Sequence, residues 1–393
     1  MKYEFPKGFY WGAATSAHQV EGDNYNDWVI WEKENAERLA CKSKKYLPEN
    51  YISGVACNHY NRYEEDFDIA KNLGHNAHRF SIEWSRIEPE EGKFDEKEIA
   101  HYQKVIGALR QRGLEPFVTL YHWTLPVWLA KKGGWLNKDA PKYFERYAKK
   151  LVSNLSKFNF DSWGVRFWIT LNEPNVYTSN SFLKGNWPPQ QKNIFKYFKV
   201  LRRLAEAHKR AYGAIKEIDA AAQIGITKNN IYFENIPLAD YFWNHKFLRQ
   251  IKNHQDFIGL NYYFHARLFG NENKSVTDMG WEIYPEGIYY LLKDLKKYNL
   301  PIYITENGLA DAKDEKREKF IKEHLHWTHK AIQEGVSVRG YFYWSLLDNF
   351  EWDKGFWPRF GLVEIDYKTM ERKIRPSAYE YAKICKSNSL NND

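Results

Sequence analysis

Short apolar runs alternate along the chain with longer segments in which apolar residues recur every three or four positions. The short runs have the length of β-strands, whereas the longer segments have the spacing of amphipathic helices. Most of the short runs are apolar throughout, which is typical of a parallel sheet that is covered on its outer face. Eight runs predict strands, at 9–17, 76–82, 115–122, 167–173, 223–228, 257–263, 301–306 and 339–345.

The longer segments predict the helices that connect these strands. Asp95 has the position of an N-cap, and Gly74 and Gly113 have the positions at which helices end. The predicted helices span 61–73, 96–112, 140–158, 195–218, 286–298 and 314–335, and a less regular pattern indicates another at 236–253. Eight strands that alternate with helices predict a (β/α)8 barrel, an α/β fold known as the TIM barrel.

The chain contains no linker rich in proline, glycine or serine, so residues 1–393 are expected to form one domain. The alternative is an open, doubly wound sheet. It is favoured less because no glycine-rich phosphate turn follows the first predicted strand.

Two of the predicted strands end at a glutamate. The runs are Ile169-Thr-Leu-Asn-Glu173-Pro and Ile302-Tyr-Ile-Thr-Glu306-Asn-Gly. Pro174 cannot donate to a sheet ladder and is expected to keep Glu173 extended. A lone glutamate at a strand end is often a structural ion-pair partner, but the carboxyl ends of barrel strands meet in the active site. Two carboxylates brought together there suit the cleavage of a glycosidic bond.

Composition narrows the possible partners and locations. The net charge is +8, but basic and acidic residues are interleaved, so nucleic-acid binding is not expected. No apolar run reaches 18 residues and no secretory signal is visible, so we expect no membrane partner. Three cysteines, an odd number without metal-like spacing, favour a reducing compartment and hence the cytoplasm. The aromatic content of 17% suits sugar binding, but core packing explains much of it.

Six motifs occur in the same order as in a known family. The chain resembles the glycoside hydrolase family 1 β-glycosidases, and the resemblance covers nearly its whole length. The motifs are Phe9-Tyr-Trp-Gly-Ala-Ala-Thr-Ser16, Arg79-Phe-Ser-Ile-Glu-Trp-Ser-Arg86, Thr119-Leu-Tyr-His-Trp123, Thr170-Leu-Asn-Glu-Pro-Asn175, Ile304-Thr-Glu-Asn-Gly308 and Trp344-Ser-Leu-Leu-Asp-Asn-Phe-Glu-Trp352.

The resemblance implies a retaining mechanism with Glu173 as acid/base and Glu306 as nucleophile. It also implies that Arg79 and Tyr263 contact Glu306 and that Asn172 binds the sugar 2-hydroxyl. The other residues implied to surround the sugar are Gln19, His122, Trp123, Glu351 and Trp352, with Trp344 as a stacking platform. No cofactor and no metal are implied.

The expected substrate is a small β-glycoside or oligosaccharide with a terminal β-D-glucosyl residue at its non-reducing end. Glu351 would repel a phosphate, so the sugar is expected to be non-phosphorylated. A preference for galactose, fucose or mannose remains an alternative, as does a non-catalytic glycan-binding relative. The oligomeric state is left open.

Several of these residues also have plainer explanations. Arg79 could brace the barrel interior, His122 could be a core histidine, and Trp344 and Trp352 could be packing residues. The stretches 229–256 and 264–300 are shorter than is usual in the family. We therefore expect a more open site for the leaving group.

Overall fold

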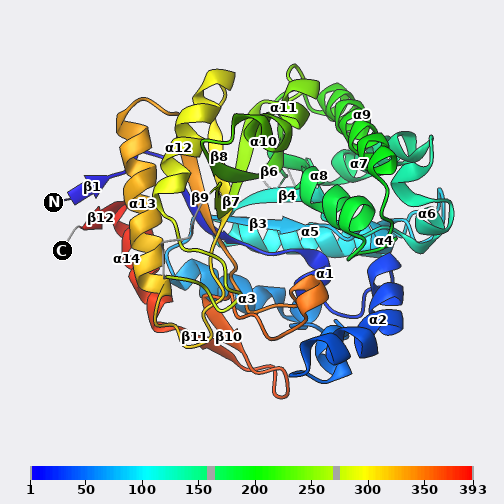
Figure 1. Ribbon diagram of the computed structural model, residues 1–393, viewed down its shortest axis with the longest axis horizontal. Coiled ribbons are helices and arrows are strands. Elements are labelled where there is room, and N and C mark those ends of the chain that lie inside the picture. Colours follow the sequence, from blue (N-terminus) through cyan, green and yellow to red (C-terminus); the bar gives the residue numbers. More distant parts are fainter. Residues whose placement is uncertain (1, 157–163, 269–274, 392–393) are drawn as a thin grey trace.

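The computed structural model describes residues 2–156, 164–268 and 275–391, and its centre is a closed barrel of eight parallel strands (Figure 1). The strands pair in chain order, and the first also pairs with the last. They are β2 (Tyr10–Ala14), β3 (Ala77–Ser81), β4 (Glu115–Tyr121), β5 (Phe167–Asn172), β6 (Gln223–Glu234), β7 (Phe257–Arg267), β8 (Ile302–Asn307) and β9 (Val338–Trp344). The predicted (β/α)8 barrel is confirmed, because every predicted run coincides with one of these strands.

Helices between the strands cover the outside of the barrel (Figure 1). Those that the periodicity predicted are α3 (His59–Asn72), α5 (Glu96–Gln111), α7 (Ala140–Leu155), α9 (Ile194–Ile218), α12 (Glu286–Leu295) and α13 (Arg317–Gln333). Asp95 is the N-cap of α5, as expected. The last two residues of the helix predicted at 140–158 lie outside the described residues.

Two further long helices were not predicted, α2 (Asp27–Ser43) and α14 (Pro376–Ser387). The buried face of α2 includes Glu32 and Asn35, and these polar residues interrupt the apolar pattern. Short strands tie the ends of the chain together: β1 (Lys2–Glu4) pairs with β12 (Ser389–Asn391), so the two ends of the chain lie side by side (Figure 1).

The remaining elements are short and lie mostly in the loops. They are α1 (Ala17–Val20), η1 (Pro48–Tyr51), α4 (Trp84–Ile87), α6 (Val127–Lys131), η2 (Gly134–Leu136), α8 (Pro174–Thr178), η3 (Ser179–Lys184), η5 (Lys296–Tyr298), η6 (Trp352–Lys354), β10 (Val363–Ile365) and β11 (Arg372–Ile374). Helix α8 begins two residues after the end of β5 and packs beside α9. None of the helices in the described residues is both long enough and apolar enough to cross a membrane.

Aromatic side chains fill the amino-terminal part of the barrel. Phe117 and Phe167 stack with their ring centroids 4.1 Å apart, and Phe342 meets Phe117 edge-on at 4.8 Å. Phe257 and Tyr303 complete this buried cluster. The amino-terminal end is therefore a packed core, and the opposite end is left for a site.

The structure corrects two features of the predicted elements. The helix expected at 236–253 is divided into α10 (Pro237–Asp240), a π-helix η4 (Tyr241–His245) and α11 (Lys246–Gln250). The side chain of Asn244 binds strand β6: it accepts a hydrogen bond from the N–H of Ile231 (3.1 Å) and donates one to the carbonyl of the same residue (2.7 Å). The helix widens to a π-helix at this point. In addition, β6 and β7 continue as a pair beyond their predicted ends at 228 and 263.

Candidate active site

A pocket of about 480 Å³ opens at the carboxyl ends of the barrel strands. Nine of the eleven residues proposed from the sequence line it: Gln19, His122, Trp123, Glu173, Tyr263, Glu306, Trp344, Glu351 and Trp352. Arg79 and Asn172 are not in the lining. They are fully buried and contact the lining residues from behind.

Glu306, near the end of β8, is held through both of its carboxylate oxygens. The hydroxyl of Tyr263 donates to Oε2 at 2.9 Å, and the guanidinium of Arg79 contacts Oε1. Burial, followed by the charge of Glu306, raises the pKa of Tyr263 well above its usual value, so the phenol keeps its proton and acts as the donor. A cation and a neutral donor therefore bind the two oxygens of Glu306.

Arg79 is fixed by further bonds inside the barrel. Its Nη2 donates to Oδ1 of Asn172 at 2.7 Å, and its Nε donates to Oγ1 of Thr119 at 3.2 Å. Arg79 therefore braces the barrel, as the plainer explanation held, and also contacts Glu306. The bond from Nη2 of Arg79 also fixes the side chain of Asn172, whose Nδ2 lies 3.1 Å from Nε2 of His122.

Glu173 follows β5 directly, and its backbone is left-handed (φ 44°, ψ 61°). The expectation that Pro174 keeps it extended is wrong. The N–H of Glu173 still bonds the carbonyl of Thr227 in β6 at 2.9 Å, while Pro174 is already the first residue of α8. The whole change of direction from strand to helix therefore falls on Glu173, and a strained residue of this kind is common at active sites.

The carboxyl group of Glu173 accepts hydrogen bonds from two amides. Nδ2 of Asn261 lies 2.8 Å from Oε1 and Nδ2 of Asn229 lies 3.3 Å from it. Burial and then the charge of Glu306 raise the pKa of Glu173 to about 8, against the lowering effect of these amides. Glu173 is therefore protonated at neutral pH. Because Oε1 accepts both bonds, the proton belongs on Oε2.

Asn229 and Asn261 were not among the predicted site residues. Asn261 stands at the end of a predicted strand, so its position offered a signal. Asn229 follows the predicted end of the fifth strand, for which no site residue had been named. A search for polar residues after every barrel strand would have found both.

Gln19 and Glu351 form one polar corner of the pocket. Nε2 of Gln19 donates to Oδ1 of Asn349 and to the carbonyl of Phe350, both at 2.9 Å, and lies 3.3 Å from Oε2 of Glu351. Gln19 thus holds the loop after β9 against α1. Burial, and then the charge of Glu306, raises the pKa of Glu351 to about 8, so this carboxyl can donate as well as accept hydrogen bonds.

His122 presents a nitrogen that no described residue binds. Because the amide of Asn172 donates to Nε2, Nδ1 carries the proton, and this buried Nδ1–H has no partner within the described parts of the chain. Burial lowers the pKa of His122 well below its usual value, so the ring is neutral. An unpaired donor in a pocket wall is suited to a ligand oxygen.

Tryptophans also line the pocket, beside His122. The ring of Trp352 is nearly parallel to that of His122, with centroids 6.0 Å apart, and packs on Trp123 at 4.9 Å. Trp344 lies nearly parallel to His122 at 6.1 Å. The packing explanation for Trp352 is thus correct in part, since one side of its ring meets other aromatic rings and the residue also lines the pocket.

The rest of the pocket lining mixes apolar and polar side chains, and none of these residues was among the eleven proposed from the sequence. Strands β6 and β7 supply part of this lining through the extensions that were not expected. Its apolar residues are Val176, Trp187, Ile231, Trp243, Phe264, Met279, Trp281 and Phe360, and its polar residues are Ser179, Asn180, Lys184, Asn186, Asn229, Asp353 and Lys354.

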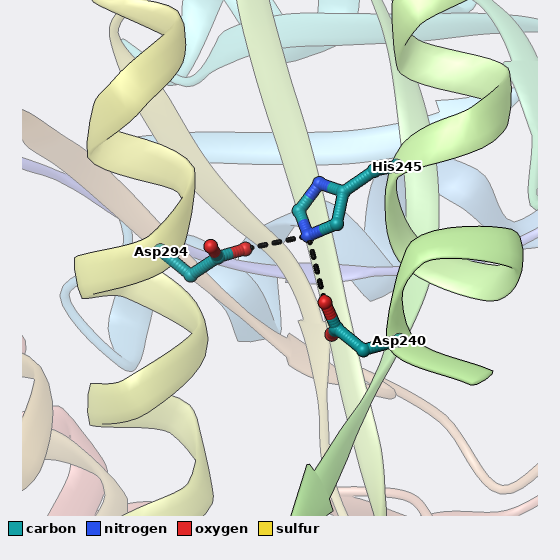
Figure 2. A group of neighbouring side chains, drawn as sticks. All are labelled: Asp240, His245 and Asp294. Carbon is teal, nitrogen blue, oxygen red and sulfur yellow. Dashed lines mark ion pairs between the residues drawn. The ribbon is translucent and has the colours of Figure 1, made fainter. Parts of the chain in front are cut away.

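One group of side chains away from the pocket has a metal-like arrangement (Figure 2). Nε2 of His245 lies 3.2 Å from Oδ2 of Asp240 and 2.8 Å from Oδ2 of Asp294. The ammonium of Lys297 lies 3.2 Å from the same nitrogen and 2.7 Å from Oδ1 of Asp294. A cation is therefore already beside these ligand atoms.

The protonation of His245 explains this group without a metal. Burial opposes the charged imidazole, but the two carboxylates outweigh burial and raise the pKa of His245. The histidine also lowers the pKa values of Asp240 and Asp294. The group is an ion-pair cluster that joins η4 to α12.

Comparison with known proteins places this geometry in a family. The model of glycosyl hydrolase family 1 matches residues 1–242 and 242–390. A β-glucosidase A of Thermotoga maritima is 38% identical over 98% of this chain and 99% of its own, and a β-galactosidase of Sulfolobus acidocaldarius is 30% identical over 98% and 96%. The solved structure of a β-glycosidase from Pyrococcus horikoshii superposes with a TM-score of 0.90 at 40% identity, over 100% of this chain and 97% of its own. The chain therefore belongs to glycosyl hydrolase family 1.

Proposed function

We propose that the protein is a retaining β-glycosidase that hydrolyses non-reducing terminal β-D-glucosyl residues of non-phosphorylated β-glycosides. The observation that carries the proposal is the contrast between two carboxyl groups of one pocket. Arg79 and Tyr263 bind the two carboxylate oxygens of Glu306, whereas burial raises the pKa of Glu173 and keeps that carboxyl protonated. One nucleophile and one acid are what the first step of retaining hydrolysis requires.

In the first step, a carboxylate oxygen of Glu306 forms a bond to the anomeric carbon. The bond from that carbon to the leaving-group oxygen breaks, and Glu173 transfers its proton to this oxygen. The products are the free alcohol, a glycosyl ester of Glu306 and an ionised Glu173.

The second step reverses the role of Glu173. Esterification removes the charge of Glu306, which was one of the two causes of the raised pKa of Glu173, so this carboxylate is now stable. It takes a proton from water while the water oxygen bonds to the anomeric carbon and the ester bond breaks. Two inversions at the same carbon leave the sugar with its original configuration.

The surrounding residues hold the sugar and the two glutamates. Gln19, His122 and Glu351 offer hydrogen bonds to sugar hydroxyls, and Trp344 offers a ring face. Trp123 and Trp352 close the wall. Arg79 acts through its contact with Glu306, and Asn172, which contacts Arg79 and His122, is the proposed partner of the 2-hydroxyl.

A preference for glucose is supported by the comparisons, since the β-glucosidase relative is 38% identical and the β-galactosidase relative 30%. Galactose, fucose and mannose remain the alternative sugars. We also propose that residues 1–393 act as one domain in the cytoplasm. The three cysteines support a reducing compartment, because none of them is in a disulfide.

Replacement of Glu306 tests the proposal. Glu306→Ala should lower the hydrolysis of an aryl β-glucoside by about 10⁴-fold or more. Azide should restore part of the turnover and give the α-glucosyl azide, because the small anion attacks from the face that the carboxylate has vacated. Glu334→Ala, which removes an exposed glutamate on another face, is the control. A β-configured azide product, or normal turnover without Glu306, would contradict the mechanism.

The same assay decides the sugar. We expect the aryl β-glucoside to have a higher kcat/KM than the matching galactoside, fucoside and mannoside. A higher value for one of the other three would establish the alternative preference and leave the mechanism unchanged.

A further inference from the structure

A group of exposed apolar side chains lies beside the mouth of the pocket. The described residues include fourteen large apolar side chains that are exposed, and seven of them lie in three short segments. Single exposed apolar residues are ordinary, but a cluster of them marks an interaction surface. The seven are Leu183 of η3, Ile194, Phe195 and Phe198 of α9, Leu238 of α10, and Tyr241 and Phe242 of η4.

These segments form one continuous face. The N–H of Asn193, at the start of α9, bonds the carbonyl of Phe182 in η3 at 2.7 Å. The ammonium of Lys246 lies 4.3 Å from the ring centroid of Phe198 and 4.9 Å from that of Phe242, and so connects α9 with η4. In Figure 1 the helices α8 to α11 lie together on one side of the barrel. We call this surface the basic apolar face.

The charge of the face is mostly positive. Residues 174–205, which contain two of its three segments, have no aspartate or glutamate but six lysines and arginines. In the third segment the carboxylate of Asp240 is paired with His245. No ion pair within the described parts of the chain involves the lysines at 184, 192, 196 and 199. The apolar cluster is therefore surrounded by positive charge that the protein itself does not neutralise.

Helix α9 carries this charge at an unfavourable place. Lys196 and Lys199 lie in its first two turns, where no acidic residue is present, although the positive end of a helix dipole disfavours cations. Phe195, in the same turn, is 82% exposed. Neither feature helps the helix to fold, and both are typical of a segment that lies on an anionic membrane surface.

We propose that the basic apolar face docks on the surface of an anionic lipid bilayer. Phe195 and Phe198 would enter the boundary between head groups and acyl chains, and the surrounding lysines would lie at the level of the anionic head groups. The sequence led us to expect no membrane partner because no segment is long enough to cross a bilayer. A face that lies on the bilayer needs no such segment.

The position of the face gives the docking a consequence for the site. Lys184 of η3 and Trp243 of η4 belong to the same segments as the face and also line the pocket. A bilayer on this face would therefore border the pocket mouth. The docking itself does not depend on the proposed function.

Vesicle binding tests the proposal. The protein should sediment with vesicles that contain about 30% phosphatidylglycerol at low salt, and much less with pure phosphatidylcholine or at high salt. Two double variants test the apolar and the charged contribution separately: Phe195→Ser with Phe198→Ser removes apolar side chains, and Lys196→Glu with Lys199→Glu reverses charges. Each should lower the partition coefficient by about tenfold or more.

The control reverses two charges elsewhere. Lys97→Glu with Lys104→Glu makes the same change of net charge on α5, where both lysines are exposed. It should bind vesicles nearly as the unchanged protein does. Equal losses in the α5 variant and the α9 charge variant would show an effect of net charge alone and would overturn the proposal.

Other occupants of the face would give other results. A dimer that Phe195→Ser with Phe198→Ser disrupts, in a protein that does not bind vesicles, would assign the face to a second copy of the chain. Retention on an insoluble β-glucan without vesicle binding would assign it to a polysaccharide. Either result would overturn the proposal. Hydrolysis of an aryl β-glucoside without lipid should be unchanged in all three variants, so this assay reports on the proposed function separately.

Discussion

The hydroxyl of Tyr263 lies 2.9 Å from Oε2 of Glu306, while Arg79 contacts the other oxygen of the same carboxylate. The two partners have different effects. Arg79 supplies charge that favours the ionised form, whereas Tyr263 supplies a directed bond from the neighbouring strand β7. The orientation of the carboxylate therefore depends on a residue that carries no charge.

Loss of the Tyr263 hydroxyl should slow catalysis without unfolding the protein. Hydrogen bonds to charged groups contribute about 1.5–3 kcal/mol, so we expect Tyr263→Phe to lower kcat/KM by about 10- to 100-fold. Tyr262→Phe is a matched control on the same strand, because its hydroxyl donates to the carbonyl of Tyr284 at 2.6 Å, outside the pocket. The control should lower Tm and leave kcat/KM nearly unchanged. Similar kinetic losses in both variants would show that the effect comes from the strand and not from Glu306.

The role of Glu173 as an acid predicts a dependence on the leaving group. Glu173→Gln cannot donate a proton, so it should slow a substrate with a poor leaving group, such as an alkyl β-glucoside, by about 10²- to 10⁴-fold. A dinitrophenyl β-glucoside needs little protonation and should react in the first step almost as before. The comparison is kcat/KM for both substrates with one enzyme preparation. Equal losses would contradict the assignment of Glu173.

The pKa of Glu173 also predicts the alkaline limit of activity. Burial and Glu306 raise this pKa to about 8, and the protonated form is the active one, so kcat/KM should fall as pH rises past about 8. Asn229→Ala removes an amide that donates to Oε1 and favours the carboxylate. The limit should then move to higher pH, by less than about one unit.

Glu351 provides the control for this pH profile, because its pKa is also raised to about 8. If Glu173 causes the fall above pH 8, the unchanged protein should show it with the alkyl β-glucoside but not with the dinitrophenyl substrate, which needs little protonation. A fall with the dinitrophenyl substrate in Glu173→Gln would belong to Glu351. A shift to lower pH in Asn229→Ala would also contradict the structure.

The barrel could be predicted from the sequence because its strands are buried on both faces. Ile169 and Ile304 lie in short, largely apolar runs that are buried at every position, and such runs differ from the helical pattern. The extensions of β6 and β7 could not be predicted in the same way. Beyond Asn230 and Tyr263 the paired strands are only partly buried, so their sequences lack a continuous apolar run.

Part of the candidate site could also be predicted from the sequence, and part of it could not. Glu173 and Glu306 were visible because each ends a strand, but the left-handed backbone of Glu173 depends on its bond to Thr227, in a different strand. Likewise, the side chain of Asn172 is fixed by its bonds to Arg79 and His122, which come from two other parts of the barrel. Contacts between different strands determine both features, and a sequence motif gives no information about such contacts.

The ion-pair cluster around His245 should make stability depend on pH. The raised pKa of His245 means that the folded protein binds its proton more tightly, so this contribution is fully present below about pH 6.5 and is lost as pH rises through the raised value. Asp294 has a lowered pKa, so its contribution disappears only in strong acid. Lys297 and Tyr298 also face the imidazole, and burial raises the pKa of Tyr298 to about 12, so this phenol keeps its proton across the range.

Replacement of Asp294 isolates the histidine pair. Asp294→Asn should lower Tm more at about pH 6 than at about pH 9, because the charged imidazole is present only at the lower pH. The bond of Asp294 to Lys297 is lost at both values and adds a constant part. Glu334→Gln is the control, since it breaks the ion pair between Glu334 and Lys293. Lys293 also lies on α12, and its ammonium does not titrate in this range. Its decrease in Tm should be the same at both pH values. An equal decrease for Asp294→Asn at the two pH values would show that His245 is neutral in the folded protein. A charged imidazole would then not contribute to the ion-pair cluster that joins η4 to α12.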